Sequence, residues 1–137
     1  MKSITKKIRP RRCQLSVPAS SKKMIEKAAS INVDGIILDL EDSVAPDQKE
    51  SARHQIIDGL MQLDWKANSV SIRINATNTE WCHQDIIELV SSCGEKIATL
   101  IVPMVNTPND LVFVETLIKQ LAIKNSSAAE ILSLIHI

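Results

Sequence analysis

The sequence predicts an α/β protein built around a parallel β-sheet, and two observations support this fold class. Short runs rich in Ile, Leu and Val recur about every 30 residues, which is typical of strands buried on both faces. The segments between these runs carry apolar residues at helical spacing. Strands that alternate with helices over short connections imply parallel pairing through right-handed crossovers.

The apolar runs give four strands and a candidate fifth, and polar residues 125–130 are predicted to form the loop before the last one. Four or five such βα units make either half of a (β/α)8 barrel or a small doubly wound sheet. Periodicity leaves both architectures open. The predicted strands are residues 13–17, 35–40, 70–74, 99–102 and 131–135.

Each predicted helix begins at a residue type that favours helix initiation. The first helix ends near residue 30, the second near residue 63, and the third at Gly94. The residues that open the four helices are Ser20 or Ser21, Pro46, Thr79 (which precedes its helix) and Pro108.

Length and composition exclude several classes of protein. The chain has 137 residues, whereas a complete (β/α)8 barrel needs about 250. Aromatic residues make up only 2%, so the core must be aliphatic. No apolar run reaches the roughly 18 residues of a membrane span. Three widely spaced cysteines without a CxxC pair indicate reduced thiols, which favours a cytoplasmic protein.

Positive charge is concentrated at the N-terminus, where nine of the 16 Lys and Arg residues fall within the first 27 positions. Such a cluster can attract a phosphate-bearing cofactor, or it can be a solvated tail. We expect residues 1–10 to form a basic tail and residues 11–137 one domain. The same basic segment leaves a mitochondrial matrix location open, whereas the scarcity of aromatic residues argues against nucleic acid.

Polar residues follow the predicted strands, and the clearest group lies around the second strand. Asp39 stands inside an apolar run, and period-two alternation places Asp39 and Glu41 on the same side, with Asp42 next to them. Two close carboxylates need a cation, and Arg73 in the next strand is the natural partner. The group can be an active site or a structural ion pair between strands, and the spacing leaves both readings open.

Other polar residues give weaker signals. His54 is expected on the surface of a helix, and His83 is a poor candidate ligand. With three glycines in the chain, no glycine-rich phosphate loop is present, and no Ser/His/Asp arrangement is evident.

Four motifs occur in the order and spacing of a known family. They are Arg11-Arg12 before VPAS at residues 17–20, LDLEDSVAP at 38–46, RINA at 73–76 and VP at 102–103. With these motifs the chain resembles the citrate lyase beta-subunit family, which includes malyl-CoA and citramalyl-CoA lyases within the HpcH/HpaI aldolase group. The resemblance spans roughly residues 10–122.

The resemblance implies the N-terminal half of a (β/α)8 barrel from a Mg2+-dependent lyase. Such enzymes cleave or form a carbon–carbon bond next to a CoA thioester. Arg73 matches an arginine that contacts the acyl group, and Glu41 and Asp42 would orient Arg73 or a water molecule. A fixed cation there would stabilise the enolate formed on the thioester carbon.

The resemblance also implies a CoA site and assembly properties. Ser16, Lys23 and Lys27 match positions around the first βα turn that bind CoA, in agreement with the basic cluster. The implied partner is a small acyl-CoA thioester, without nucleic acid or membrane, and the full-length protein is expected to be a homo-oligomer.

The chain departs from the family at the fourth strand and at the metal site. Ala19 replaces a usual Gly, and Met104 and Asn106 replace Lys and Glu. The family's metal ligands end strands five and six, beyond the matched region. His136 stands where the first would be expected, and Val114-Glu115-Thr116 resembles that motif only in letters because its context is helical.

We therefore expect a fragment without metal ligands and without lyase activity of its own. The apolar end without a following helix also predicts a truncated chain, or a non-native segment at residues 132–137. Two other functions stay open: a non-catalytic CoA- or nucleotide-binding or assembly domain, and an aldolase acting on free 2-keto acids.

Overall fold

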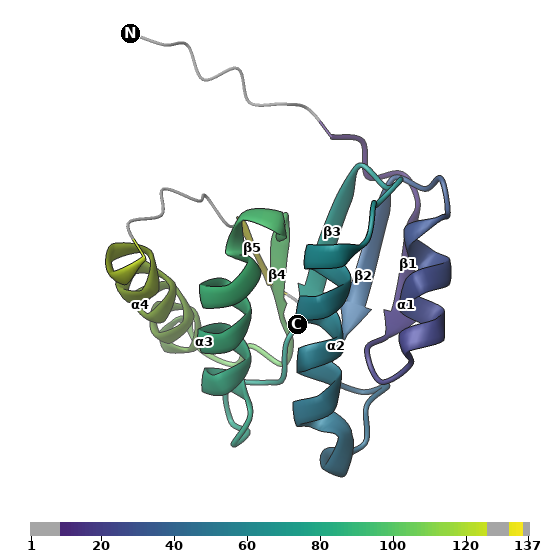
Figure 1. Ribbon diagram of the computed structural model, residues 1–137. Coiled ribbons are helices and arrows are strands. Elements are labelled where there is room, and N and C mark those ends of the chain that lie inside the picture. The colour runs from purple at the N-terminus through teal and green to yellow at the C-terminus, as the bar shows by residue number, and fades with distance from the viewer. Residues whose placement is uncertain (1–8, 126–131, 136–137) are drawn as a thin grey trace, which may run out of the picture.

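The computed structural model describes residues 9–125 and 132–135, in which parallel strands alternate with helices (Figure 1). The α/β prediction is confirmed, and the strand ends differ from the predicted ones by one residue at most. The elements are β1 (Gln14–Pro18), α1 (Lys22–Ala29), β2 (Gly35–Asp39), the 3-10 turn η1 (Pro46–Gln48), α2 (Lys49–Gln62), β3 (Ser69–Arg73), α3 (Cys82–Cys93), the 3-10 turn η2 (Gly94–Lys96), β4 (Thr99–Val102), α4 (Pro108–Lys124) and β5 (Leu132–Ile135).

The strands form one parallel sheet in the order β1-β2-β3-β4-β5. Each strand therefore pairs with the next one along the chain. Right-handed crossovers that always advance in the same direction place every helix on the same face of the sheet. A doubly wound sheet would have to reverse its order. The topology is that of the first half of a (β/α)8 barrel, which resolves the choice that periodicity left open.

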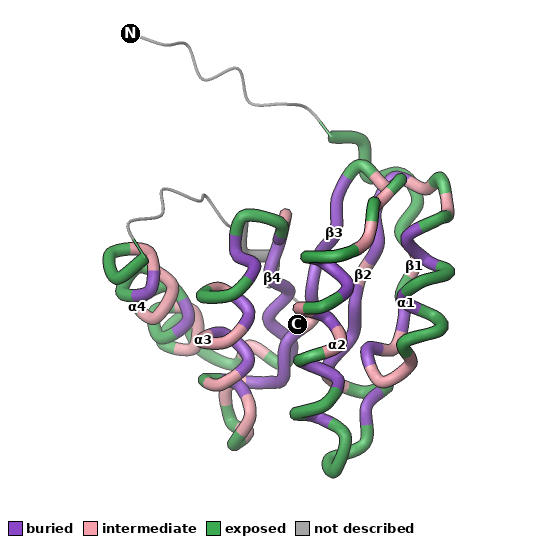
Figure 2. The backbone as a smooth tube through the Cα atoms, viewed as in Figure 1, coloured by how far each residue is buried: buried purple, intermediate pink, exposed green. Residues whose placement is uncertain are grey.

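One hydrophobic core joins the helices to this face of the sheet. Alternate residues of the strands, such as Leu38 and Ile72, are fully buried, and every helix contributes to the same cluster. Figure 2 shows the buried segments along the strands and the sheet-facing sides of the helices. The core is aliphatic, as the composition predicted. The helix residues at its centre are Ile25, Ile56, Ile86 and Val114.

The opposite face of the sheet carries mainly small and polar side chains, together with Ile37 and Ile101. It carries Ser16 from β1, Asp39 from β2, Ser71 and Arg73 from β3, and Thr99 from β4. These positions alternate with the core residues, and their register places Asp39 beside Arg73. The face that would line a barrel interior therefore holds the chemically active side chains.

The helix starts follow the sequence signals with one change: Pro46 opens the 3-10 turn η1, and α2 begins after it at Lys49. Of the two candidate caps, Ser21 caps α1, and its Oγ accepts from the Met24 amide at 3.3 Å. Thr107 and Asp110 form a capping box at the start of α4. Thr79 precedes α3, as expected, and Trp81 occupies the N-cap position.

The three cysteines are free, with Cys13 exposed and Cys82 and Cys93 buried. Burial raises the pKa of Cys82 to about 12, helped by the nearby Asp85 carboxylate, and raises that of Cys93 to about 11. Neither buried thiol is therefore a nucleophile near neutral pH. In the described part of the chain, no helix combines the length and apolar character that a membrane crossing requires.

Candidate functional site

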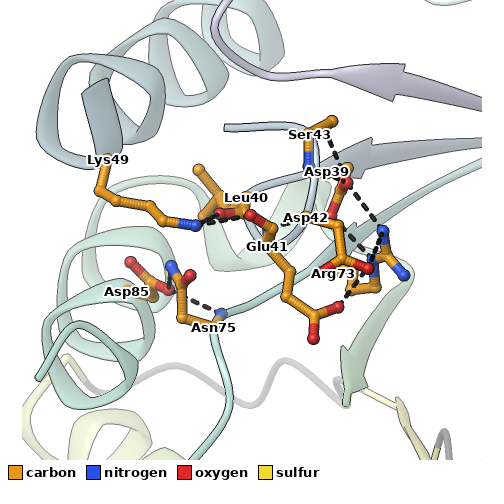
Figure 3. A network of polar contacts seen from close by, with 9 residues as sticks. All are labelled: Asp39, Leu40, Glu41, Asp42, Ser43, Lys49, Arg73, Asn75 and Asp85. Carbon is orange, nitrogen blue, oxygen red and sulfur yellow. Dashed lines mark hydrogen bonds and ion pairs between the residues drawn. The ribbon is translucent and has the colours of Figure 1, made fainter. Parts of the chain in front are cut away.

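The carboxyl ends of β2 and β3 bring the main charged groups together (Figure 3). Asp39 is the last residue of β2 and Arg73 the last of β3, and the parallel register pairs them directly. Adjacent residues on one face of a sheet have their side chains in contact range. The pairing that the sequence predicted is therefore built into the strand register.

Arg73 and Asp39 form a two-pronged ion pair. Arg73 Nε donates to Asp39 Oδ1 and Arg73 Nη2 donates to Asp39 Oδ2, both at 2.8 Å. The Asp39 side chain is 2% exposed and the Arg73 side chain 23%. This hydrogen bond raises the pKa of Arg73 above its usual value. The guanidinium is thus permanently charged, fixed in orientation and still partly open to a ligand.

Asp39 is saturated with donors. Besides the two bonds from Arg73, it accepts from the Glu41 amide at 2.9 Å, the Ser43 amide at 3.1 Å and the Ser43 hydroxyl at 2.7 Å. Burial raises the pKa of Asp39, but the bonds from Arg73, Ser43 and Glu41 outweigh it and hold that pKa at about 2. Asp39 is therefore ionised at any physiological pH, and both of its carboxylate oxygens accept hydrogen bonds.

Glu41 and Asp42 lie further from Arg73. Arg73 Nε is 3.2 Å from Glu41 Oε2, whereas Arg73 Nη2 is 3.9 Å from Asp42 Oδ2, and the Asp42 side chain is 80% exposed. Burial raises the pKa of Glu41, and the charges of Asp42 and Asp39 add to this against the opposing effect of Arg73. The Glu41 carboxylate thus takes up a proton more readily than that of an ordinary glutamate.

Sequence reasoning placed Asp39 beside Arg73 but gave the orienting role to Glu41 and Asp42. The structure brings all three carboxylates to Arg73, and its shortest contacts are with Asp39. The difference arises because Asp39 is inside the strand, where register fixes it, whereas Asp42 is in the exposed loop that follows.

A buried lysine supports the loop from behind. Lys49 is only 5% exposed, and its Nζ donates to the main-chain oxygens of Leu40 and Glu41, both at 2.6 Å. The same nitrogen lies 5.3 Å from the centroid of the Trp81 ring. The sequence predicted no role for Lys49.

A second buried network holds the end of β3. Asp85 of α3 is fully buried and accepts from Arg53 Nε at 3.0 Å, from the Asn75 amide at 2.9 Å and from Asn75 Nδ2 at 2.7 Å. Arg53 Nη1 also lies 3.2 Å from Glu88 Oε1. The main chain just after Arg73 is therefore tied to both α2 and α3.

The residues expected to bind CoA lie on the first βα unit. Ser16 is exposed on the inner face of β1, and Lys23 and Lys27 are exposed one turn apart on α1. Neither lysine forms a salt bridge to another residue of the described ranges. Their role in binding CoA stays a prediction.

Several weaker sequence interpretations can also be placed. The His54 side chain is 58% exposed and lies 3.5 Å from Glu88, and His83 is exposed on α3. Glu115 lies within α4, as expected from its helical context. His136 falls outside the described residues. Met104, just after β4, has a φ of 52°, a left-handed conformation that is unusual for a residue with a side chain.

The described residues do not fit a magnesium site. Residues 9–125 and 132–135 contain no group of three or more His, Cys, Asp or Glu side chains able to hold a metal ion. Asp39, the most buried carboxylate beside Arg73, has both oxygens engaged by nitrogen and hydroxyl donors. What this site can do is bind an anionic or carbonyl oxygen through the fixed guanidinium of Arg73.

Comparisons with known proteins agree with this geometry. The family model described as HpcH/HpaI aldolase/citrate lyase matches residues 12–136. An L-malyl-CoA/beta-methylmalyl-CoA lyase from Cereibacter sphaeroides is 40% identical over 110 residues, which cover 80% of this chain and 35% of the relative. A (3S)-malyl-CoA thioesterase from the same species is 34% identical over 109 residues, covering 80% of this chain and 37% of the relative. The chain thus spans about a third of the length of these relatives.

Two solved structures show the same arrangement of elements. The citrate lyase beta subunit from M. tuberculosis, complexed with oxaloacetate and magnesium, is 26% identical with a TM-score of 0.61, covering 89% of this chain and 46% of that one. Malate synthase from Haloferax volcanii is 13% identical with a TM-score of 0.77, covering 89% and 40%, and shows the fold alone.

Proposed function

The chain belongs to the HpcH/HpaI aldolase/citrate lyase family, and on this premise we propose that it forms part of a Mg2+-dependent lyase acting on CoA thioesters. The proposed reaction is retro-Claisen cleavage of a malyl-CoA-like ester to acetyl-CoA and a keto acid. The supporting observation is Arg73, a cation fixed by Asp39 at the carboxyl end of β3 and still partly exposed. The names of the relatives point to the same substrate class.

The chemistry places a specific demand on this cation. When the carbon–carbon bond breaks, its electron pair moves to the thioester and forms an enolate, while the hydroxyl of the leaving part loses its proton to a base and becomes a carbonyl. The enolate then takes up a proton on carbon, which gives acetyl-CoA. Arg73 would contact the acyl group and stabilise the developing negative charge. Because Asp39 holds the guanidinium in place, it need not reorganise during the reaction. One preorganised donor of this kind contributes roughly 3 to 4 kcal/mol to the transition state.

Mg2+ would act as a Lewis acid on the substrate's oxygen atoms when bound. A solved relative is described as complexed with magnesium and oxaloacetate. We propose that its ligands lie outside the residues described for this chain, because those residues do not fit the ion.

Turnover by the complete protein tests the proposal. We expect malyl-CoA, citramalyl-CoA or citryl-CoA, with Mg2+, to give an acyl-CoA and a keto acid, and Arg73→Lys to reduce kcat/KM about 100-fold. The 137-residue chain alone is expected to be inactive. Release of free CoA without carbon–carbon cleavage would point to a thioesterase instead. Cleavage of free 2-keto acid aldols, with no use of CoA esters, would contradict the proposed substrate class.

We also propose that Ser16, Lys23 and Lys27 bind the CoA moiety. Both lysines are exposed, basic and close to β1, so they can meet phosphate groups. Calorimetry with CoA should show affinity reduced roughly threefold to tenfold by Lys23→Ala or Lys27→Ala. Lys119→Ala on α4 is the matched control. Equal CoA affinities for the wild type and all three variants would contradict this proposed binding site.

The proposed setting is cytoplasmic, with a homo-oligomeric complete protein and a basic tail at residues 1–10 ahead of the domain at 11–137. Support comes from the free thiols of Cys82 and Cys93, which are typical of a reducing compartment. Light scattering of the purified complete protein measures the assembly, and a monomer at micromolar concentration would contradict it.

A further inference from the structure

Resting on the function proposed above, we propose that Lys49 is a positioning residue that holds Glu41 against Arg73 by fixing the main chain behind it. Lys49 does not reach the inner face of the sheet itself. Figure 3 shows its side chain running from α2 to the Leu40–Glu41 segment, with Glu41 extending beyond toward Arg73.

The ammonium group of Lys49 makes three contacts within the protein. Nζ donates to the carbonyl oxygens of Leu40 and Glu41 at 2.6 Å each, and lies 5.3 Å from the Trp81 ring centroid. Both carbonyls follow the last residue of β2. A single cation thus binds two consecutive peptide oxygens of the loop that carries the acidic group.

Glu41 is held at three points. Its amide donates to Asp39 Oδ1 at 2.9 Å, its carbonyl accepts from Lys49 at 2.6 Å, and its carboxylate lies 3.2 Å from Arg73 Nε. Without Lys49, the Glu41 carbonyl would lose its restraint, so the loop would open more often and only the bond from the Glu41 amide to Asp39 would oppose that opening. The predicted consequence is a displaced Glu41 carboxylate and an unchanged Arg73–Asp39 pair.

The free-energy cost of burying Lys49 indicates that its side chain does more than fill space in the core. An ammonium removed from water carries a desolvation penalty, and burial lowers the pKa of Lys49 against the opposing effect of Asp85, Asp39, Glu41 and Asp42. Leu40 is fully buried, so its carbonyl oxygen needs a donor from within the protein. The buried cation gives charge-assisted bonds that fix both carbonyl oxygens in one place.

Kinetics of the complete protein form the first test. Lys49→Met keeps the aliphatic stem and removes the charge. We expect kcat to fall about 100-fold, the loss typical of a misplacement near 1 Å, with KM for the CoA ester within about twofold because CoA binds elsewhere. Lys49→Arg, which can still donate to two carbonyls, should recover most of kcat. Lys119→Met on the exposed face of α4 is the control and should match the wild type.

Amide hydrogen exchange on the 137-residue chain gives a test that needs no activity. In Lys49→Met the Glu41 and Ser43 amides, both bonded to Asp39, should exchange at least about tenfold faster, while the Ile72 amide in β3 keeps its rate. If Lys49 only stabilised the fold as a whole, its replacement would speed exchange of the Glu41, Ser43 and Ile72 amides equally. Equal protection in wild type and variant, or an undiminished kcat, would overturn the proposal.

Two results need a separate interpretation: a Lys49→Met variant that does not fold, and a wild type without lyase activity. If Lys49→Met does not fold, Trp81→Leu and Trp81→Phe replace it, because they keep the charge and alter only the ring beside it. Trp81→Leu should then show faster Glu41 exchange than Trp81→Phe, and equal exchange in both would overturn the proposal. If the wild type lacks lyase activity, the proposed function fails, whereas the exchange data still decide whether Lys49 positions Glu41.

Discussion

At the level of single residues, Asp39 organises the site. It accepts both prongs of Arg73 and also ties down the loop at Glu41 and Ser43. Period-two alternation predicted that Asp39 and Glu41 share a side, and the apolar strand around Arg73 made that residue their natural partner. Asp39, and not Glu41 or Asp42, is the two-pronged partner of Arg73 because of the path of the loop after β2. The spacing of apolar residues does not predict that path.

Asp39 should make stability depend on pH in the acid range. Its pKa is about 2 in the folded chain and near its ordinary value when unfolded, so its contribution of roughly 2 kcal/mol is present above about pH 4. It is lost as the pH falls through 2. Urea unfolding between pH 7 and pH 2 should show the gap between wild type and Asp39→Asn shrinking.

Asp58→Asn, on the exposed side of α2, is the matched control for this series. A gap between wild type and Asp39→Asn that stays constant across the pH range would contradict the assignment.

Met104 provides a backbone prediction. Its φ of 52° costs a residue with a side chain roughly 1 kcal/mol, which glycine avoids. Met104→Gly should therefore raise the free energy of unfolding by a few tenths to about 1 kcal/mol. Met61→Gly, at a similarly exposed methionine in the last turn of α2, should lower it by a few tenths to about 1 kcal/mol. Urea denaturation measures both, and the same sign for the two variants would refute the argument.

At the level of elements, α2 and α3 hold the strand ends through buried charges. The sequence predicted both helices from their apolar spacing, but it did not predict these charges. A signal was present: Lys49 and Arg53 share the buried side of α2 with Ile56 and Leu60, and Asp85 occupies a buried position of α3. A charged residue on an apolar stripe therefore marks a buried pair, although its partner depends on how the helices pack.

Removing Asp85 tests the joint between α2, α3 and β3. Asp85→Ala leaves Arg53 buried without its closest partner and removes the acceptor of Asn75. We expect a loss of roughly 3 to 5 kcal/mol in the free energy of unfolding. Glu115→Ala, an exposed carboxylate on α4, should change it by less than about 0.5 kcal/mol. Comparable small effects of both substitutions in urea would show that the network is dispensable.

At the level of the whole molecule, the polar inner face and the two outer strands remain open within the described residues. Alternating strands and helices predicted the α/β class, but only the family resemblance predicted half of a barrel. The spacing of apolar residues does not determine the order of the strands in the sheet. β1 and β5 are the outer strands of the sheet. Unpaired edges of this kind favour pairing with other chains.

The isolated 137-residue chain should accordingly self-associate. Sedimentation velocity over a range of protein concentrations should show an average mass that rises without reaching a plateau. The complete protein, in which a closed barrel would remove both edges, should give one discrete species. A concentration-independent monomer for the isolated chain would contradict this expectation.

The order of strands along the sheet has a further consequence for synthesis in the cell. Because every strand pairs with the one made just before it, the growing polypeptide never has to wait for a distant segment. Each βα unit can dock as it leaves the ribosome, and short-range pairing of this kind favours rapid folding. The last strand to emerge then serves as the template for the next, so the molecule is assembled in the direction in which it is translated.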